Sequence, residues 1–156
     1  MNRRELFSSL IKKTGASDNT CSSSLLPYVK DTRLLSICAK CSAPCLKACD
    51  ENIIILKNGV PLLNFEKGGC TFCKKCAKSC NKNVLDENMP PKIDVKISIK
   101  TTKCLSWKNV MCFACKDACK AILFFGMFRP TINEQICTKC GKCINLCPQN
   151  AILALK

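Results

Sequence analysis

The chain of 156 residues contains 17 cysteines, about 11% of its length, and carries a formal charge of +14. Without the cysteines its apolar fraction falls to roughly 36%, too little for a self-sufficient core, so metal bonds or cross-links must help to hold the fold. Histidine is absent and the carboxylates are scattered, which argues against an enzyme with its own substrate site.

The first 36 residues are interpreted as a basic segment followed by a linker. Apolar residues at helical spacing are flanked here by basic ones: Leu6, Phe7, Leu10 and Ile11 beside Arg3, Arg4, Lys12 and Lys13. This pattern favours an amphipathic helix that either covers the rest of the chain or contacts a partner protein. The serines from Ser22 to Ser24 indicate a flexible linker, and Cys21 beside them is interpreted as a spare thiol.

The other cysteines form four motifs of four, and each motif ends in C-x3-C. Motif 1 is Cys38, Cys41, Cys45 and Cys49; motif 2 is Cys70, Cys73, Cys76 and Cys80; motif 3 is Cys104, Cys112, Cys115 and Cys119; motif 4 is Cys137, Cys140, Cys143 and Cys147. Motif 4, followed by Pro148, has the spacing with which bacterial ferredoxins hold [4Fe–4S] clusters. Motif 2 repeats this spacing, and motifs 1 and 3 are variants of it. The sequence therefore predicts four [4Fe–4S] clusters with these cysteines as ligands.

The regions around the motifs indicate short helical turns and strands. Each C-x3-C pair predicts a helical turn, and apolar residues that follow it predict a short strand. A hairpin is predicted between motifs 1 and 2, where residues 53–56 and 60–63 flank Asn58–Gly59. A second one is predicted between motifs 3 and 4, from residues 122–125 and 129–132. This repetition indicates two copies of a two-motif module.

The segment between motifs 2 and 3 separates the two copies. Met89-Pro90-Pro91 opens it, and alternating apolar residues over 93–99 predict one strand. We therefore divide the chain into an N-terminal segment (1–36), a first module (37–90) and a second module (91–156). The predicted fold class is α+β, with two tandem bacterial-ferredoxin-like 2[4Fe–4S] modules built from short helices and small β-hairpins.

The C-x3-C ending predicts that each motif serves two clusters. Residues i and i+4 lie on one face of a helix, about 6 Å apart along its axis. In two-cluster ferredoxins the fourth cysteine of one motif binds the cluster of the other. By this rule Cys80 joins motif 1 and Cys49 joins motif 2, while Cys147 and Cys119 are exchanged between motifs 3 and 4. Nested pairing, of motif 1 with 4 and of motif 2 with 3, is the alternative.

The long gap inside motif 3 departs most from ferredoxin spacing. Seven residues separate Cys104 from Cys112 and include Trp107, Val110 and Met111. They are interpreted either as a loop folded over the third cluster or as a docking loop for a partner.

Two other uses of so many cysteines are less consistent with the sequence. A disulfide scaffold belongs to oxidising compartments, but the first 30 residues contain no apolar leader, and no run approaches the ~20 apolar residues of a membrane span. A reducing, cytoplasmic setting is therefore expected. Zinc sites pair two C-x2-C units across a long loop, whereas motifs 2 and 4 crowd three cysteines into seven residues.

A nucleic-acid partner is also disfavoured. Cluster ligation would lower the net charge to about +6, because ligand thiolates are negative. One tryptophan and one tyrosine leave little for base stacking. A basic face that docks an acidic redox partner fits the charge equally well.

The residues around motif 2 resemble a known family. Gly69-Cys70-Thr71-Phe72-Cys73-x2-Cys76, preceded by Gly59-Val60-Pro61 and Asn64-Phe65, is similar to the ferredoxin-type NapF proteins of periplasmic nitrate reductase systems. The spacings of motifs 1 and 3 agree, and the resemblance covers about residues 36–156. It implies a cytoplasmic iron–sulfur accessory protein that acts on the precursor of the nitrate reductase catalytic subunit before export, in maturation or electron supply. A polyferredoxin for another anaerobic oxidoreductase is the alternative.

Overall fold

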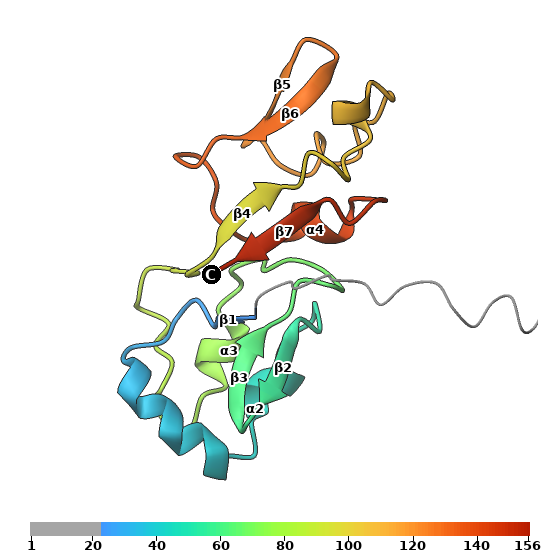
Figure 1. Cartoon of the computed structure of the whole chain (residues 1–156). Coiled ribbons are helices and arrows are strands. Elements are labelled where there is room, and N and C mark those ends of the chain that lie inside the picture. Colours follow the sequence, from blue (N-terminus) through green and yellow to red (C-terminus); the bar gives the residue numbers. More distant parts are fainter. Residues whose placement is uncertain (1–22) are drawn as a thin grey trace, which may run out of the picture.

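The computed structural model describes residues 23–156; the predicted N-terminal helix and Cys21 lie outside this range. Two lobes are stacked along one long axis (Figure 1), with β1–β3, η1, α2 and α3 in the first and β4–β7, η2 and α4 in the second. The helices are the 3₁₀ helices η1 (Thr32–Lys40) and η2 (Ser106–Lys108) and the α-helices α2 (Pro44–Lys47), α3 (Lys75–Lys78) and α4 (Lys142–Asn145). The strands are β1 (Ser24–Leu25), β2 (Ile54–Lys57), β3 (Val60–Leu63), β4 (Lys96–Ile99), β5 (Ile122–Phe125), β6 (Phe128–Ile132) and β7 (Ile152–Leu155). Within the described residues no helix is long and apolar enough to cross a membrane.

The first lobe is built on an antiparallel sheet with the strand order β1-β3-β2. β2 and β3 form the first predicted hairpin, which is confirmed. Its turn residues Asn58 and Gly59 have φ values of 52° and 76°, as a two-residue hairpin turn requires. A Cβ on Gly59 would lie 2.9 Å from the Cα of Ala39, so the turn also packs closely against η1.

Part of the segment before motif 1 belongs to the core of this lobe. Ser24, expected in a flexible linker, instead lies in β1 and is 1% exposed. Leu26 and Tyr28 are buried, and Val29 forms an isolated β-bridge with Leu85. The sequence does not reveal this packing because the paired segment is too short to show a period.

The second lobe contains two separate antiparallel pairs, β4 with β7 and β5 with β6. The β5–β6 pair is the second predicted hairpin, which is also confirmed. β4 begins only at Lys96, so the strand predicted over residues 93–99 is shorter than expected. Ile93 and Val95 are nevertheless buried, which shows that the alternation marks burial beyond the paired strand.

The helical turn predicted in each C-x3-C pair forms in motifs 1, 2 and 4, as α2, α3 and α4. Each helix follows a residue with left-handed backbone: Ala43, Lys74 and Gly141, with φ values of 50°, 63° and 80°. In motif 3 the prediction is wrong, because residues 114–118 form turns. Phe113, at the equivalent position, is not among the described residues with positive φ. The chain therefore reaches the third cysteine of motif 3 along a different path, after the longer loop.

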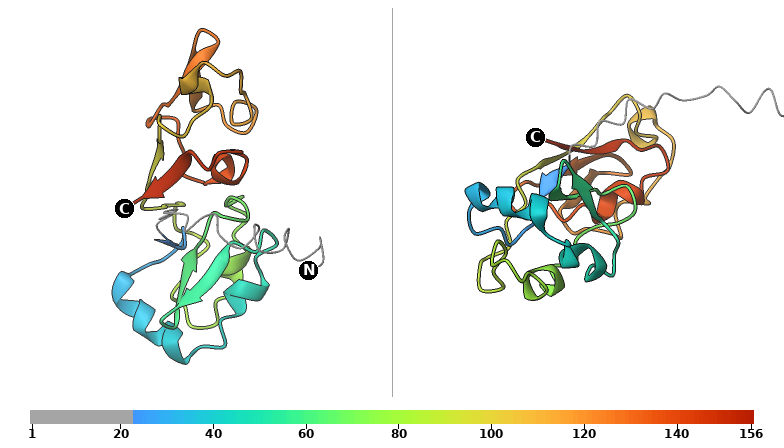
Figure 2. Two further views of the ribbon diagram at one scale, coloured as in Figure 1. Left: turned by 45° about the vertical axis from the view of Figure 1, so that its right-hand side comes forward. Right: turned by 90° about the horizontal axis from the view of Figure 1, so that it is seen from below.

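One apolar core runs through both lobes. It joins residues of the first lobe, such as Ile53 and Phe65, to residues of the second, such as Ile122 and Ile152. Buried thiols of both lobes belong to the same core. The C-terminal end of β7 lies near the junction of the lobes in Figures 1 and 2. The cysteines that could bind a metal are therefore also part of the packed apolar core.

Candidate metal centres

The 16 cysteines of the described residues are free thiols. They gather in four groups, which we name sites A to D. Site A holds Cys38, Cys41, Cys45 and Cys80; site B holds Cys49, Cys70, Cys73 and Cys76; site C holds Cys104, Cys112, Cys115 and Cys147; site D holds Cys119, Cys137, Cys140 and Cys143. Each cysteine that the sequence singles out as a ligand therefore lies in one of these groups.

Each site takes three thiols from one motif and the fourth from the other motif of the same lobe. Burial raises the pKa of Cys38, and the negative charge of the neighbouring Cys80 thiolate raises it further. Burial likewise raises the pKa of Cys115 to about 11, and Cys147 adds to the rise. This grouping is the one expected for tandem pairing. Nested pairing would instead place Cys80 with thiols of motif 3.

The short helices explain how one motif reaches two sites. α2 carries Cys45 of site A, and one turn later the backbone N–H of Cys49, whose thiol belongs to site B, donates to the Leu46 carbonyl at 3.3 Å. α4 similarly carries Cys143 of site D and is followed by Cys147 of site C. The two sites of each lobe are therefore joined by a single helical turn, about 6 Å long along the axis.

An asparagine three residues after the last cysteine recurs in motifs 1, 2 and 4. Asn52, Asn83 and Asn150 have φ values of 52°, 54° and 47°, a left-handed backbone that asparagine tolerates better than most residues. The N–H groups of Asn52 and Asn150 donate to the carbonyls of Cys49 and Cys147 at 3.1 and 3.0 Å. The sequence reasoning missed these turn residues, although the repeated C-x2-N pattern is a visible signal.

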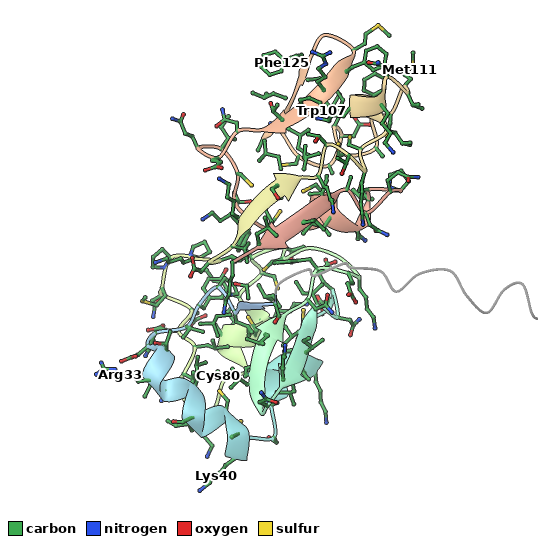
Figure 3. All side chains as sticks on the ribbon, viewed as in Figure 1. Arg33, Lys40, Cys80, Trp107, Met111 and Phe125 are labelled. Atoms are coloured by element: carbon green, nitrogen blue, oxygen red, sulfur yellow. The ribbon has the colours of Figure 1, made fainter. Side chains whose placement is uncertain are left out.

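Site A is lined by residues of η1, α2, β3 and the segment after α3, and most of this lining is apolar. Leu35, Pro61 and Val84 contribute to it. Figure 3 shows Cys80 beside η1, whose ends are marked by Arg33 and Lys40. Cys45 is buried among these residues, and the burial of a cluster is one of the factors that set its reduction potential.

Site B is packed against a tyrosine that the sequence reasoning missed. The Tyr28 hydroxyl donates to the Phe72 carbonyl at 3.0 Å, and the Phe72 N–H donates to the Cys70 sulfur at 3.4 Å. Burial raises the pKa of Tyr28, and the thiolates of Cys70, Cys76 and then Cys73 raise it further. An isolated aromatic residue in an apparent linker gave no pattern from which this role could be read. Tyr28 thus supports the backbone that holds site B.

Site C lies beside the long loop of motif 3. Leu105, Pro130 and Pro148 contribute to its apolar lining. The indole N–H of Trp107 donates to the Pro130 carbonyl at 3.1 Å and so fastens the loop to β6. The N–H of Ala151 donates to the Cys147 sulfur at 3.3 Å. Of the seven loop residues Leu105 lines the site, whereas Val110 and Met111 are exposed, so both predicted roles of the loop stay open.

Site D is open on one side. Cys137 lines a cavity of about 370 Å³, together with Lys139 and the Lys96–Glu134 ion pair. Burial raises the pKa of Cys137, and a hydrogen bond from the Lys139 backbone N–H, together with the positive charge of its side chain, partly offsets that rise. Cys143 is only 6% exposed, and burial raises its pKa to about 12. One side of the site thus meets solvent while another lies in the core.

The donor chemistry of these sites fits iron–sulfur clusters. Burial raises the pKa of Cys76 to about 12, so four thiolates in one pocket need the positive charge of a metal core. Among residues 23–156, no three ligand-type side chains come close enough together to hold a single metal ion. Zinc needs four donors around one centre, with sulfurs at about 2.3 Å. Four thiols at each site can supply one ligand to each iron atom of a [4Fe–4S] core.

Large apolar side chains are exposed at the outer end of the second lobe, next to site C. We call this surface the apolar cap; its members are Val110, Met111, Leu123, Phe125 and Met127, each at least 46% exposed. Figure 3 shows Met111 and Phe125 at this end of the molecule. The exposed basic residues of the same segments are Lys108, Lys116, Lys120 and Arg129. Asp117 is the single acidic residue between Cys104 and Ile132, so the cap lies among positive charges.

The fold and the four thiol groups together define a small iron–sulfur protein of the ferredoxin type. Residues 130–153, which include all of motif 4, match the 4Fe-4S binding domain family. The chain belongs to the family of ferredoxin-type NapF proteins, as its resemblance predicted. It is 34% identical to NapF of Escherichia coli K12 over 131 residues, covering 80% of this chain and 79% of that protein.

Two further relatives show how far the similarity extends. NapF of Haemophilus influenzae is 32% identical over 135 residues, which cover 80% of this chain and 73% of that protein. The methylamine utilization ferredoxin-type protein MauM of Methylorubrum extorquens is 26% identical over 137 residues, 72% of this chain and 62% of that protein. The similarity is therefore higher to the NapF proteins than to a ferredoxin-type protein named for a different system.

Proposed function

We propose that the chain is an electron-transfer accessory protein that holds four [4Fe–4S] clusters, one at each of sites A to D. The observation that carries this proposal is the convergence of four thiols from two motifs at every site. Two tandem modules, residues 37–90 and 91–156, would each hold two clusters. The clusters supply reversible one-electron chemistry, and the chain sets their potentials through burial and N–H···S bonds.

Metal analysis of anaerobically purified protein tests this proposal. Four clusters correspond to about 16 iron and 16 acid-labile sulfide per chain, with an absorption band that dithionite bleaches. A plateau of about eight iron, with two clusters detected by EPR, would contradict the four-cluster assignment. Zinc without sulfide would reject the electron-transfer function altogether.

The partner follows from family membership and remains part of the proposal. The NapF family is associated with periplasmic nitrate reductase, so we infer that the chain acts in the cytoplasm on the precursor of the catalytic subunit, in maturation or electron supply. It has no substrate of its own in this function. The apolar cap supports a protein contact beside site C, and its basic surroundings favour an acidic partner.

Direct binding to the purified precursor tests the partner. The expected result is a complex that forms with the holoprotein and transfers electrons from its reduced clusters to the reductase. Absence of both binding and electron transfer would favour the second candidate, a polyferredoxin for another oxidoreductase. The similarity to a methylamine utilization protein favours that candidate. Binding assays against other oxidoreductases expressed by the same cells would then identify the partner.

A further inference from the structure

The two lobes touch through one cysteine from each of their inner sites. The backbone N–H of Cys70 donates to the carbonyl of Cys140 at 2.7 Å. Cys70 belongs to site B of the first lobe, and Cys140 belongs to site D of the second. Sites B and D are therefore neighbours, although their motifs are far apart in sequence.

Two glycines allow this close approach. A Cβ on Gly69 would lie 2.4 Å from the backbone nitrogen of Lys142, closer than real Cβ contacts allow. A Cβ on Gly141 would lie 2.2 Å from the ring of Phe65, which is fully buried. Gly141 also has a φ of +80°, which glycine adopts without strain. At Gly69 the backbones of the two lobes meet directly, and at Gly141 the backbone of the second lobe packs against the Phe65 ring of the first.

A third contact fastens the same surfaces. The side-chain amide of Asn145, at the end of α4, donates to the Lys67 carbonyl at 3.2 Å. The loop before motif 2 is thereby held against both ends of α4. Because α4 carries Cys143 of site D and is followed by Cys147 of site C, the junction is tied to the helix that joins the two sites of the second lobe.

We propose that the four sites form one linear electron path in the order A–B–D–C, with the contact between Cys70 and Cys140 as its crossing between lobes. Helical turns join A to B and D to C, and the glycine-lined junction joins B to D. The order differs from the order of the motifs in the sequence. Site A is lined in part by α2 of the first lobe and site C in part by β6 of the second, and Figure 1 shows these two elements on opposite sides of the junction. This inference rests on the proposed function, because it requires clusters at the sites.

The crossing is a simple one-electron exchange. With clusters bound, the thiols of sites B and D would hold a one-electron donor and a one-electron acceptor, so that the group at site B would be oxidised and the group at site D reduced by one electron each. No bond forms or breaks, and no proton is required. A low-potential one-electron reductant supplies the electron, dithionite in the experiments below, and the acceptor at the far end is a redox protein. Gly69 and Gly141 act as positioning residues that set the distance between sites B and D.

EPR on cluster-depleted variants of the holoprotein tests the order. Sites A and C are removed together by Cys38→Ser, Cys41→Ser, Cys104→Ser and Cys112→Ser, which leaves B and D. Sites B and D are removed together by Cys70→Ser, Cys73→Ser, Cys137→Ser and Cys140→Ser, which leaves A and C. After dithionite reduction, we expect spin–spin broadening and faster spin relaxation in the first variant and isolated signals in the second. Isolated signals in both, with about eight iron retained, would overturn the order.

Adjacent glycines provide a matched pair with all ligands intact. A Cβ on Gly68 would meet its nearest neighbours at 3.6 Å, which is ordinary contact, whereas a Cβ on Gly69 overlaps Lys142. Gly69→Ala should therefore weaken the spin–spin interaction between the clusters at sites B and D, while Gly68→Ala should leave it unchanged. The two variants should hold the same amount of iron. Equal spin–spin interaction in both variants would contradict the role of the junction.

The outcomes separate this inference from the proposed function. Wild-type protein without about 16 iron would reject the four-cluster proposal, whatever the glycines do. Wild-type protein with four clusters but no interaction between B and D would reject only the path. If Gly69→Ala loses iron, Asn145→Ala decides, because it removes the hydrogen bond to Lys67 without introducing a Cβ clash. Asn145→Ala should then weaken the interaction at full iron content, and an unchanged interaction counts against the junction.

Discussion

Cys80 lies in one pocket with Cys38, although the two cysteines belong to different motifs. The exchange arises because α3 holds Cys76 at site B, and the chain then turns so that Cys80 reaches site A. The thiolate of Cys80 raises the pKa of Cys38 through this proximity. A substitution at the end of motif 2 should therefore be felt at a site built mainly from motif 1.

Cys80→Ala should damage the cluster of site A and leave site B intact. One cluster would lose a ligand, so iron content should fall by up to about four atoms per chain. Iron analysis with EPR of the reduced protein measures the loss. Cys49→Ala is the matched control, because Cys49 ends motif 1 but lies at site B. Loss of the same cluster in both variants would contradict the exchange.

The hairpins and the ligand groups are the parts of the structure that the sequence predicts best. Asn58–Gly59 between two apolar runs specifies its turn locally, and the regular cysteine spacing specifies the helical turns of motifs 1, 2 and 4. Both signals are confined to a few consecutive residues. They can be read without knowing how distant segments pack.

Features that depend on distant contacts could not be read in this way. The burial of Tyr28 depends on β1 pairing with β3, and a strand of two residues has no detectable period. The approach of Gly69 to Lys142 depends on the packing of one lobe against the other. Motif 3 forms turns instead of a helix because its longer loop brings the chain to Phe113 without the left-handed backbone that precedes the other three helices.

Removal of the metal should unfold both lobes. The buried thiols belong to the same apolar core as the surrounding aliphatic residues, and burial raises the pKa of Cys45 to about 11. Without a metal, the buried thiols contribute little to the stability of so small an apolar core. A chelator under reducing, anaerobic conditions should abolish the cooperative unfolding transition and raise protease sensitivity. Protected amides throughout both lobes in the apoprotein, measured by hydrogen exchange, would contradict this expectation.

The apolar cap should contribute to partner binding. Phe125 is 72% exposed and Met127 is 54% exposed, so their burial in a complex would remove apolar surface from water. The double substitution Phe125→Ser and Met127→Ser should weaken binding to the reductase precursor by about tenfold or more, which corresponds to about 1.4 kcal/mol. Titration calorimetry with the holoprotein measures the change.

Leu56→Ser supplies the matched control for the cap. Leu56 is 48% exposed, but it lies on β2 in the first lobe. Binding should stay within about twofold of wild type in this variant. Higher salt should weaken the wild-type complex, since the cap lies among basic residues. Equal losses from Leu56→Ser and from the cap substitutions would place the contact elsewhere.

Residues 23–36 should be needed for full cluster content, although they contain no cysteine. The sequence places the whole of residues 1–36 outside the modules, and on that basis their removal should leave the iron content almost unchanged. The structure leads to a different expectation for the second part of this segment. Tyr28 holds the Phe72 carbonyl beside site B, and Leu35 lines site A.

Two truncations therefore isolate the contribution of residues 23–36. A chain that begins at residue 37 should hold less iron at sites A and B than a chain that begins at residue 23, because it lacks Tyr28 and β1. Sites C and D serve as internal controls, since their described linings contain no residue before 37. Iron analysis and EPR of the two proteins, purified anaerobically side by side, give the comparison. Equal occupancy of all four sites in both chains would show that residues 23–36 are not needed for cluster binding. A comparison of how the two chains bind the precursor would then show whether these residues contact the partner.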